Sequence, residues 1–285
     1  MRKSALLFVA LTSFLLQSCE DPISIDLPSD STYLVVEGWI TDQPGPYRVR
    51  LSQTLPFASP ETNPKISNAK VYITSKGVNY FLAENPEIPG EYLTDSAEFV
   101  GTPGVNYKLV IEWEDKIIIS TENSFKAAPP IDTLTYSFVP NIFVPETLSF
   151  TSGYLVTGFV SDPATENDYY RWKVSENGIS YDRAEDLILI TDRFFNGKKF
   201  GFELSNLLFQ VDDTVSVSQY TIDAAAFEYL KNINTQAIGL GKSTSTPPSL
   251  VRGNLKYLND DEGVILGYFG MSSVSSAQVV IKKNQ

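Results

Sequence analysis

The only cysteine of the chain, Cys19, is the residue whose surroundings point most directly to a chemical modification. It follows Leu15-Leu16-Gln17-Ser18, a string that resembles a bacterial lipobox, with a leucine three residues before the cysteine and a small residue immediately before it. In this interpretation the thiol receives a diacylglycerol, cleavage follows Ser18, and Cys19 becomes the acylated first residue. We therefore expect covalent acyl chains on Cys19 and no other cofactor.

Residues 1–18 have the features of a signal peptide, since the basic pair Arg2-Lys3 is followed by an apolar stretch that ends at Leu16. This stretch is shorter than the roughly 20 residues of a transmembrane helix but suits the apolar region of a signal peptide. A lone cysteine often packs as a small buried hydrophobe, but such a residue would not directly follow this kind of leader. The polar, proline-containing residues 19–32 predict a lipidated cysteine with an extended tether. Acyl chains would hold the protein on a membrane, at about 0.8 kcal/mol per buried methylene, without spanning it.

The charge of the chain excludes one large class of function. The formal net charge is −12, and loss of residues 1–18 would remove Arg2 and Lys3 and bring it to −14. Nucleic-acid binding needs clustered lysine and arginine, and the sequence holds no such cluster. The lack of histidine also excludes Ser-His-Asp and Cys-His catalysis and histidine-ligated zinc. Carboxylate chemistry and a Ser-Lys nucleophile stay open.

Three acidic residues, Glu112, Glu114 and Asp115, could supply the paired carboxylates of a glycan hydrolase. That chemistry needs two carboxyl groups at a defined separation across a cleft. Their expected place at a strand end and turn is instead typical of solvated charges. We therefore expect no catalytic residues and keep hydrolysis as the weaker alternative.

A second acidic run, residues 259–263, contains the candidate metal ligands Asp260, Asp261 and Glu262. Oxygen-rich loops bind calcium, but this spacing does not match the EF-hand loop. A polar turn before the following apolar strand explains the run without a metal. The sequence therefore predicts no metal site here.

Aromatic residues supply the candidates for a binding surface. On a strand, Tyr169 would face the side opposite to Trp172, so that Trp172 belongs to the core and Tyr169 is open to a ligand. Phe194 and Phe195 precede Asn-Gly in a turn-like context and are candidates for an exposed apolar contact. A sugar, a peptide or a partner protein could use such residues, because aromatic side chains are enriched at binding hot spots.

The first half of the mature chain predicts an antiparallel β-sandwich over residues 33–128. Short runs of alternating or β-branched residues are separated by Gly/Pro turns. The expected strands are 33–40, 47–51, 69–74, 78–83, 107–113 and 116–120. Residues 114–115 predict a two-residue hairpin connection. Two alanines and two prolines at 127–130 indicate the end of this domain, since consecutive prolines cannot continue a ladder of hydrogen bonds.

The second half, residues 129–285, is expected to form another mostly β domain. Its expected strands are 133–139, 154–161, 169–175, 187–191, 214–220, 264–272 and 278–282. One segment, 222–233, has the spacing of an amphipathic helix, with Thr221 as a candidate N-cap and Asp223 in the first turn. The fold class is therefore mainly β, with one helix near residues 222–233.

Several strings of the mature chain together resemble a family of Bacteroidota outer-membrane lipoproteins, domain of unknown function 4249. They are residues 19–28, 34–42, 45–52, 66–73, 90–92, 130–134, 253–254 and 266–269. The resemblance implies that residues 33–128 are immunoglobulin-like and that the protein is held at the outer membrane. It also implies a neighbouring TonB-dependent receptor of the kind that imports nutrients. Glu20 and Asp21, directly after the cysteine, look like the surface-export signal of that phylum and imply an outward-facing anchor.

These features lead to three hypotheses of function. The first is a non-enzymatic accessory or ligand-binding partner of a TonB-dependent transporter, with a glycan or peptide as possible ligand. The second is a structural or adhesive surface protein. The third is a carboxylate-dependent hydrolase of surface glycans, which would need two converging acids, one with a raised pKa. Fold alone does not choose among them.

Overall fold

The computed structural model describes residues 32–55, 61–144, 149–164, 167–205, 207–239, 249–260 and 262–283. Of residues 141–144 and 149–150 it describes the backbone alone. Cys19, the leader, the tether and Asp261 lie outside the described residues. The described part is mainly β, as predicted, with the helix α2 near the expected place.

The described part of the first half contains seven strands, and six of them confirm the strand pattern expected there. The seven strands are β1 (Leu34–Thr41), β2 (Arg48–Gln53), β3 (Lys70–Ser75), β4 (Val78–Glu84), β5 (Glu91–Thr94), β6 (Lys108–Trp113) and β7 (Lys116–Ser120). Trp113 pairs with Lys116, which confirms the two-residue hairpin, and Glu114 takes the left-handed conformation that a tight turn requires. The sequence analysis missed β5, because its four residues are too few to show a period.

The hydrogen-bonded order of these strands is that of an immunoglobulin fold. The order is β7-β6-β3-β4-β5-β2-β1, which corresponds to G-F-C followed by D-E-B-A when the seven strands are lettered along the chain. Here β3 and β4 also pair with each other, so one continuous path joins the two halves. Tyr107, just before β6, accepts a hydrogen bond from the backbone N–H of Thr102 at 2.9 Å. This is the tyrosine corner expected at that position of the fold.

Two strands from the far end of the chain extend this sheet at its two edges. β15 (Leu255–Tyr257) pairs with β7, and β16 (Ile265–Ser272) pairs in parallel with β1 over its whole length. The side-chain amide of Asn254 bonds both the N–H and the C=O of Phe269, at 2.9 and 2.8 Å, on β16. The segment 33–128 therefore shares its sheet with residues 255–272, which the sequence analysis did not foresee. The predicted division at residue 128 stays a prediction.

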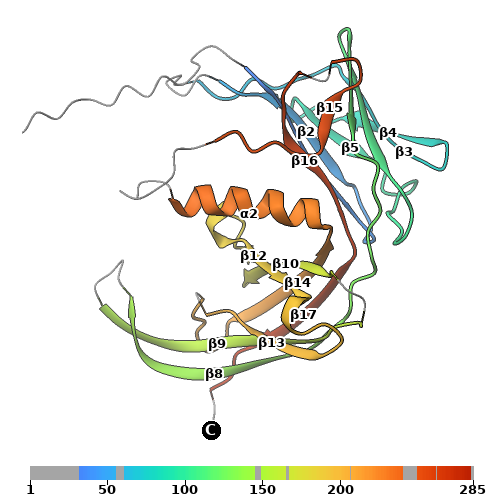
Figure 1. The fold of residues 1–285 in the computed structure, drawn as a ribbon. Coiled ribbons are helices and arrows are strands. Elements are labelled where there is room, and N and C mark those ends of the chain that lie inside the picture. Colours follow the sequence, from blue (N-terminus) through green and yellow to red (C-terminus); the bar gives the residue numbers. More distant parts are fainter. Residues whose placement is uncertain are drawn as a thin grey trace, which may run out of the picture. The chain divides into compact units, whose positions relative to one another are not determined.

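The remaining strands form two further sheets that share one hydrophobic core. One sheet contains β8 (Ile131–Val144), β9 (Ser149–Ser161) and β13 (Lys199–Glu203). The other contains β10 (Tyr169–Glu176), β11 (Ile179–Ser180), β12 (Ile188–Thr191), β14 (Thr214–Ile222) and β17 (Val274–Val280). Trp172 is 1% exposed within this core, as predicted from the alternation along the strand, and Tyr170 on the same face is also 1% exposed. Figure 1 shows β8 and β9 on one side of β10, β14 and β17, with α2 on the other side.

Helix α2 runs over Ala224–Gly239, six residues further than predicted, and packs against β10 and β16. Its first turn is capped by Asp223, whose carboxylate accepts the N–H of Ala226 at 2.6 Å. The predicted cap, Thr221, was wrong, because Thr221 is still part of β14 and its hydroxyl bonds the backbone of Ser273. Within the described residues, none of the helices has the length and apolar character needed to cross a membrane.

Strand β16 runs directly into β17 through Ser273, so a single stretch of chain belongs to two sheets (Figure 1). The carboxylate of Asp42, just after β1, holds this junction. It accepts the hydroxyl of Ser273 and, at 3.0 Å, the N–H of Val274. The same junction places the face of β16 that carries Tyr268 against α2.

Candidate functional site: an arginine-lined pocket

A pocket of about 290 Å³ lies where the faces of β1, β2 and β16 meet helix α2 and strand β10. It is lined by Glu37, Gly38, Trp39, Arg48, Arg50, Arg171, Tyr229, Leu230 and Tyr268. The volume is at the lower end of the range for small-molecule sites, so a single sugar ring or the end of a peptide would fill it. Three arginines and three aromatic rings give the pocket a chemistry unlike that of the rest of this acidic chain.

Two of the arginines come from β2 and are held by one carboxylate. Arg48 and Arg50 lie two residues apart and therefore on the same face of the strand. The Nε atoms of both contact Oε2 of Glu91, at 2.9 and 3.3 Å, while Asn85 bonds the other oxygen at 2.9 Å. Glu91 is 3% exposed, whereas both arginine side chains are about half exposed. One buried anion thus orients two guanidinium groups whose outer parts reach solvent.

The third arginine, Arg171 on β10, presents a donor without an acceptor. Its Nε is buried and has no hydrogen-bond partner among the described residues. Burial lowers the pKa of this guanidinium, opposed by the charges of Tyr220 and Asp182. An arginine nevertheless stays protonated in proteins, and an unpaired buried donor costs about 1–3 kcal/mol. A ligand with an acceptor oxygen would satisfy this group.

Three aromatic rings form the apolar wall of the pocket. Trp39 stacks on Tyr268 with centroids 6.2 Å apart, and Tyr229 of α2 lies 4.9 Å from Tyr268. Gly270, opposite Trp39 in register, makes this arrangement possible, since a Cβ there would lie 2.2 Å from the indole ring. The indole N–H of Trp39 donates to Ser272 at 2.9 Å. The wall is therefore fixed by backbone and by hydrogen bonds before any ligand arrives.

The hydroxyl of Tyr229 adds a neutral polar group to the pocket. Burial, with a smaller contribution from Glu37, raises the pKa of Tyr229 to about 12. The hydroxyl is thus protonated at neutral pH, and the described residues provide it with no hydrogen-bond partner. It can donate to a ligand oxygen or accept from a ligand hydroxyl.

The charge balance of the pocket favours an anionic ligand. Its lining holds three arginines and one carboxylate, Glu37, and Glu91 behind the arginines adds a second, which leaves a net charge of +1. The chain as a whole carries −12. Guanidinium groups bind carboxylates and phosphates through paired hydrogen bonds. The arrangement can therefore hold an anionic group beside a flat apolar surface.

Glu91 should make the stability of the protein depend on pH. The hydrogen bond from Asn85, together with the charges of Arg50 and Arg48, holds the pKa of Glu91 below its ordinary value of 4.5. A lowered pKa contributes stability above 4.5 that is lost as the pH falls through the native-state pKa. We expect Glu91→Gln to lower the free energy of unfolding by about 1–3 kcal/mol near neutral pH. The difference from wild type should shrink in acid, and urea unfolding at a series of pH values would show a constant difference if this account is wrong.

The predicted binding residues do not line this pocket. Tyr169 packs on Phe227 of α2, with ring centroids 5.0 Å apart, and belongs to the interface of the helix with its sheet. Phe195 stacks on Phe200 at 3.9 Å. Phe194 is 84% exposed, as its turn context indicated. Ligand binding by these residues stays a prediction, and the structure does not bring them together.

The predicted acidic candidates are turn and surface groups in the described residues. Asp260 accepts the backbone N–H groups of Glu262 and Gly263, both at 3.1 Å, which is the behaviour of a turn-forming aspartate. Glu112 contacts Lys70 at 3.0 Å and Tyr72 at 3.1 Å on neighbouring strands. The third metal candidate, Asp261, lies outside the described residues.

Sequence reasoning missed the arginine pocket for a physical reason. Its groups come from β1, β2, β10, α2 and β16, which are far apart along the chain. Arg48 and Arg50 carried a usable signal, since two cations with a spacing of two on an exposed strand face are unusual in so acidic a chain. Gly270 is a second signal, because a glycine inside a strand often marks a close approach of another group.

The described residues define a mainly β protein in which the edge strand β16 of an immunoglobulin-like sheet continues into strand β17 of a second, helix-covered sandwich. A model of the family described as Domain of unknown function (DUF4249) matches residues 20–278. The chain belongs to this family, as the resemblance of its strings indicated. No curated protein matches the chain.

Proposed function

We propose that the protein is an outward-facing, lipid-anchored lipoprotein of the outer membrane. In this proposal it acts as a non-enzymatic, ligand-binding accessory of a TonB-dependent nutrient transporter. Acyl chains on Cys19 hold it to the membrane, and residues 20–32 give it reach. Membership of the family supports the proposal, and so does the leader that precedes Cys19. The arginine-lined pocket supplies the place for a ligand.

The observation that carries the ligand-binding part is the unpaired, buried Nε of Arg171 beside a rigid aromatic wall. A buried donor without an acceptor is costly and is rarely retained without a use. Together with the half-exposed guanidinium groups of Arg48 and Arg50, it favours a ligand that carries a carboxylate. A uronic acid or the C-terminal end of a peptide has this chemistry and fits the volume.

The acidic residues considered for hydrolysis favour a non-enzymatic protein. A general acid in glycoside hydrolysis needs a raised pKa. A hydrogen bond from Lys70 instead lowers the pKa of Glu112. Glu114 occupies the two-residue turn between β6 and β7. These positions suit surface charge better than a catalytic pair.

The test of the pocket is a binding measurement on the purified mature protein with Arg171→Met as the variant. Calorimetric titrations would compare glucuronate with neutral glucose, and glycyl-tyrosine with its C-terminal amide. We expect binding of a carboxylate-bearing probe but not of its neutral counterpart, and a loss of about 10- to 100-fold in affinity for Arg171→Met, because a hydrogen bond to a charged group contributes about 1.5–3 kcal/mol. Arg183→Met, at an exposed arginine paired with Asp186, is the matched control and should bind normally. Equal affinity of Arg171→Met and Arg183→Met, or equal binding of charged and neutral probes, would contradict the proposal that the pocket binds a carboxylate.

A further inference from the structure

Three buried aspartates gather at one end of the second sandwich. Asp162, Asp168 and Asp192 are 6%, 5% and 3% exposed, and each offers one carboxylate oxygen within 4.8 Å of the others. These residues are distinct from the arginine-lined pocket and from the acidic run at 259–263. Carboxylates are almost never this buried unless they are paired or bind a metal.

The topology explains why the three residues meet. Asp168 directly precedes β10 and Asp192 directly follows β12, and these two strands pair antiparallel with Tyr169 opposite Thr191. The N–H of Asp192 consequently donates to the C=O of Asp168 at 3.0 Å. Asp162 follows the last residue of β9 and so comes from the facing sheet.

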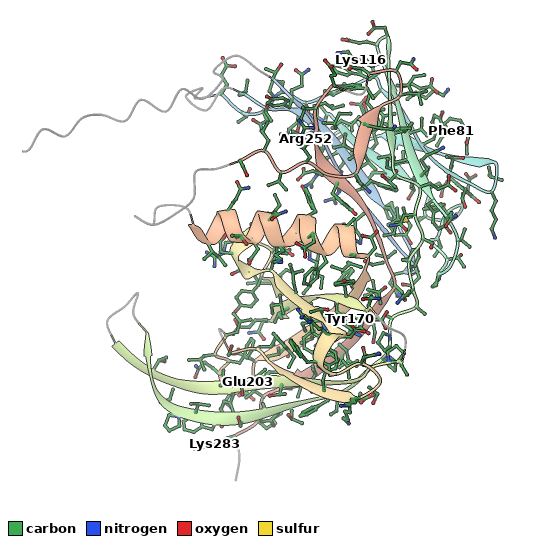
Figure 2. All side chains as sticks on the ribbon, in the orientation of Figure 1. Phe81, Lys116, Tyr170, Glu203, Arg252 and Lys283 are labelled. Carbon is green, nitrogen blue, oxygen red and sulfur yellow. The ribbon has the colours of Figure 1, made fainter. Side chains whose placement is uncertain are left out.

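Two of the three carboxylates have partners. Asp162 accepts the hydroxyl of Tyr170 at 2.6 Å and the N–H of Gly197 at 3.1 Å. Asp168 makes an ion pair with Lys126. Tyr170, which is labelled in Figure 2, therefore donates its hydroxyl to one member of the cluster.

The third carboxylate is left without a partner. Oδ2 of Asp192 is buried and accepts no hydrogen bond within the described part of the chain. Neither Asp162 nor Asp192 makes an ion pair among the described residues. An isolated buried carboxylate costs several kcal/mol in the charged form, and like charges this close repel each other. Lys126 thus offsets only one of the three carboxylates.

We propose that Asp162, Asp168 and Asp192 bind a calcium ion. Carboxylate oxygens select hard cations, which leaves calcium, magnesium and manganese among the common divalent metals. Magnesium usually keeps several of its waters, whereas calcium accepts six to eight oxygens in flexible geometry. Calcium suits this site better, because the three side chains are buried and come from loop ends. The ion would tie the end of β9 to the paired ends of β10 and β12 and so join the two sheets of the sandwich.

The experiment is a calcium titration of the mature protein after chelator treatment and dialysis. We expect one ion per chain with a dissociation constant of about 0.1–1 mM or lower, the range of extracellular calcium modules. Thermal unfolding should shift upward with calcium concentration, since a ligand bound by the native state alone stabilises it. Asp192→Asn should weaken calcium binding at least tenfold.

Asp260→Asn is the matched control, because it removes a carboxylate from the exposed acidic run and should leave calcium binding unchanged. If Asp192→Asn does not fold, calcium binding by the cluster is tested with Asp162→Asn and with the calcium-dependent rise of the wild-type melting temperature. The proposal is overturned if about 10 mM calcium, roughly tenfold above the weak end of that range, neither binds nor stabilises the wild-type protein. It is also overturned if Asp260→Asn loses binding while Asp192→Asn keeps it.

Discussion

Removal of Cys19, the proposed site of lipid attachment, is expected to release the protein from the membrane. We expect Cys19→Ala to shift the protein from the membrane fraction to the soluble fraction. The reason is that the apolar stretch ending at Leu16 is too short to span a bilayer, while two or more acyl chains give stable anchoring at about 0.8 kcal/mol per buried methylene. Fractionation of cells that produce the tagged protein, followed by immunoblotting, measures the shift.

A second variant tests anchoring without the original leader. It is needed because the leader of Cys19→Ala, if it is not cleaved, could itself hold the chain at the membrane. In this second variant a cleavable leader without a lipobox is fused directly to Glu20, so that neither Cys19 nor residues 1–18 remain. Ser24→Ala, a change in the tether that leaves Cys19 in place, is the control and should stay with the membrane. Membrane retention of the Glu20 fusion at the wild-type level would defeat the anchoring argument.

Trp172→Ala is expected to cause the largest loss of stability of any single substitution in the second sandwich. The indole is 1% exposed and lies directly against Gly158, where a Cβ would come within 2.5 Å of the ring. Truncation of a buried tryptophan to alanine costs about 3–5 kcal/mol through lost burial and the cavity left behind. It also leaves Oε1 of Gln219, now bonded by the indole N–H at 2.9 Å, without that donor. Because native proteins have about 5–15 kcal/mol of stability in total, this is a large fraction.

Urea unfolding followed by circular dichroism measures this loss. The control is Phe194→Ala, which truncates an aromatic side chain that is 84% exposed and should change the free energy of unfolding by less than about 0.5 kcal/mol. Trp172→Phe separates the contribution of apolar burial from that of the hydrogen bond, since it retains a ring but removes the N–H that bonds Gln219. Equal stability of Trp172→Ala and Phe194→Ala would mean that Trp172 is not a core residue.

The local structure could be predicted from the sequence where the signal is itself local. Alternation placed Trp172 in the core, on the face opposite Tyr169. The turn at Glu114 and Asp115 was found although it lacks glycine, because a short apolar, β-branched run lies on each side of it. Short strands such as β11 and β13 were missed, since two to five residues carry too little periodicity to separate a strand from a loop.

The long-range structure could not be predicted from these signals. Nothing local marks Ile265–Ser272 as the parallel neighbour of Leu34–Thr41, because such a pair depends on which edge is left open when the rest of the sheet has formed. The helix cap was misplaced by two residues for a related reason. Thr221 and Asp223 are both good N-caps, and the pairing of β14 with β10, in which Thr221 lies opposite Tyr170, keeps Thr221 in the strand.

The arginine-lined pocket and the aspartate cluster could not be predicted either, because each brings together residues that are far apart in the sequence. The arginine-lined pocket joins β2 to β10, and the aspartate cluster joins loop ends at residues 162, 168 and 192. The run at 259–263 has more acidic residues close together in the sequence. The carboxylate of Asp260, however, accepts hydrogen bonds from the backbone of its own turn. Burial, which the sequence does not display, distinguishes a solvated acid from one that needs a cation.

The measurement that tests the central claim most directly is capture of the tagged protein from native outer membrane after gentle detergent extraction, with mass spectrometry of the material that accompanies it. The account predicts a TonB-dependent receptor in stoichiometric amount, retained with wild type and with Arg183→Met. Recovery of the protein alone from the membrane fraction would contradict the transporter assignment and favour an adhesive or hydrolytic surface protein instead.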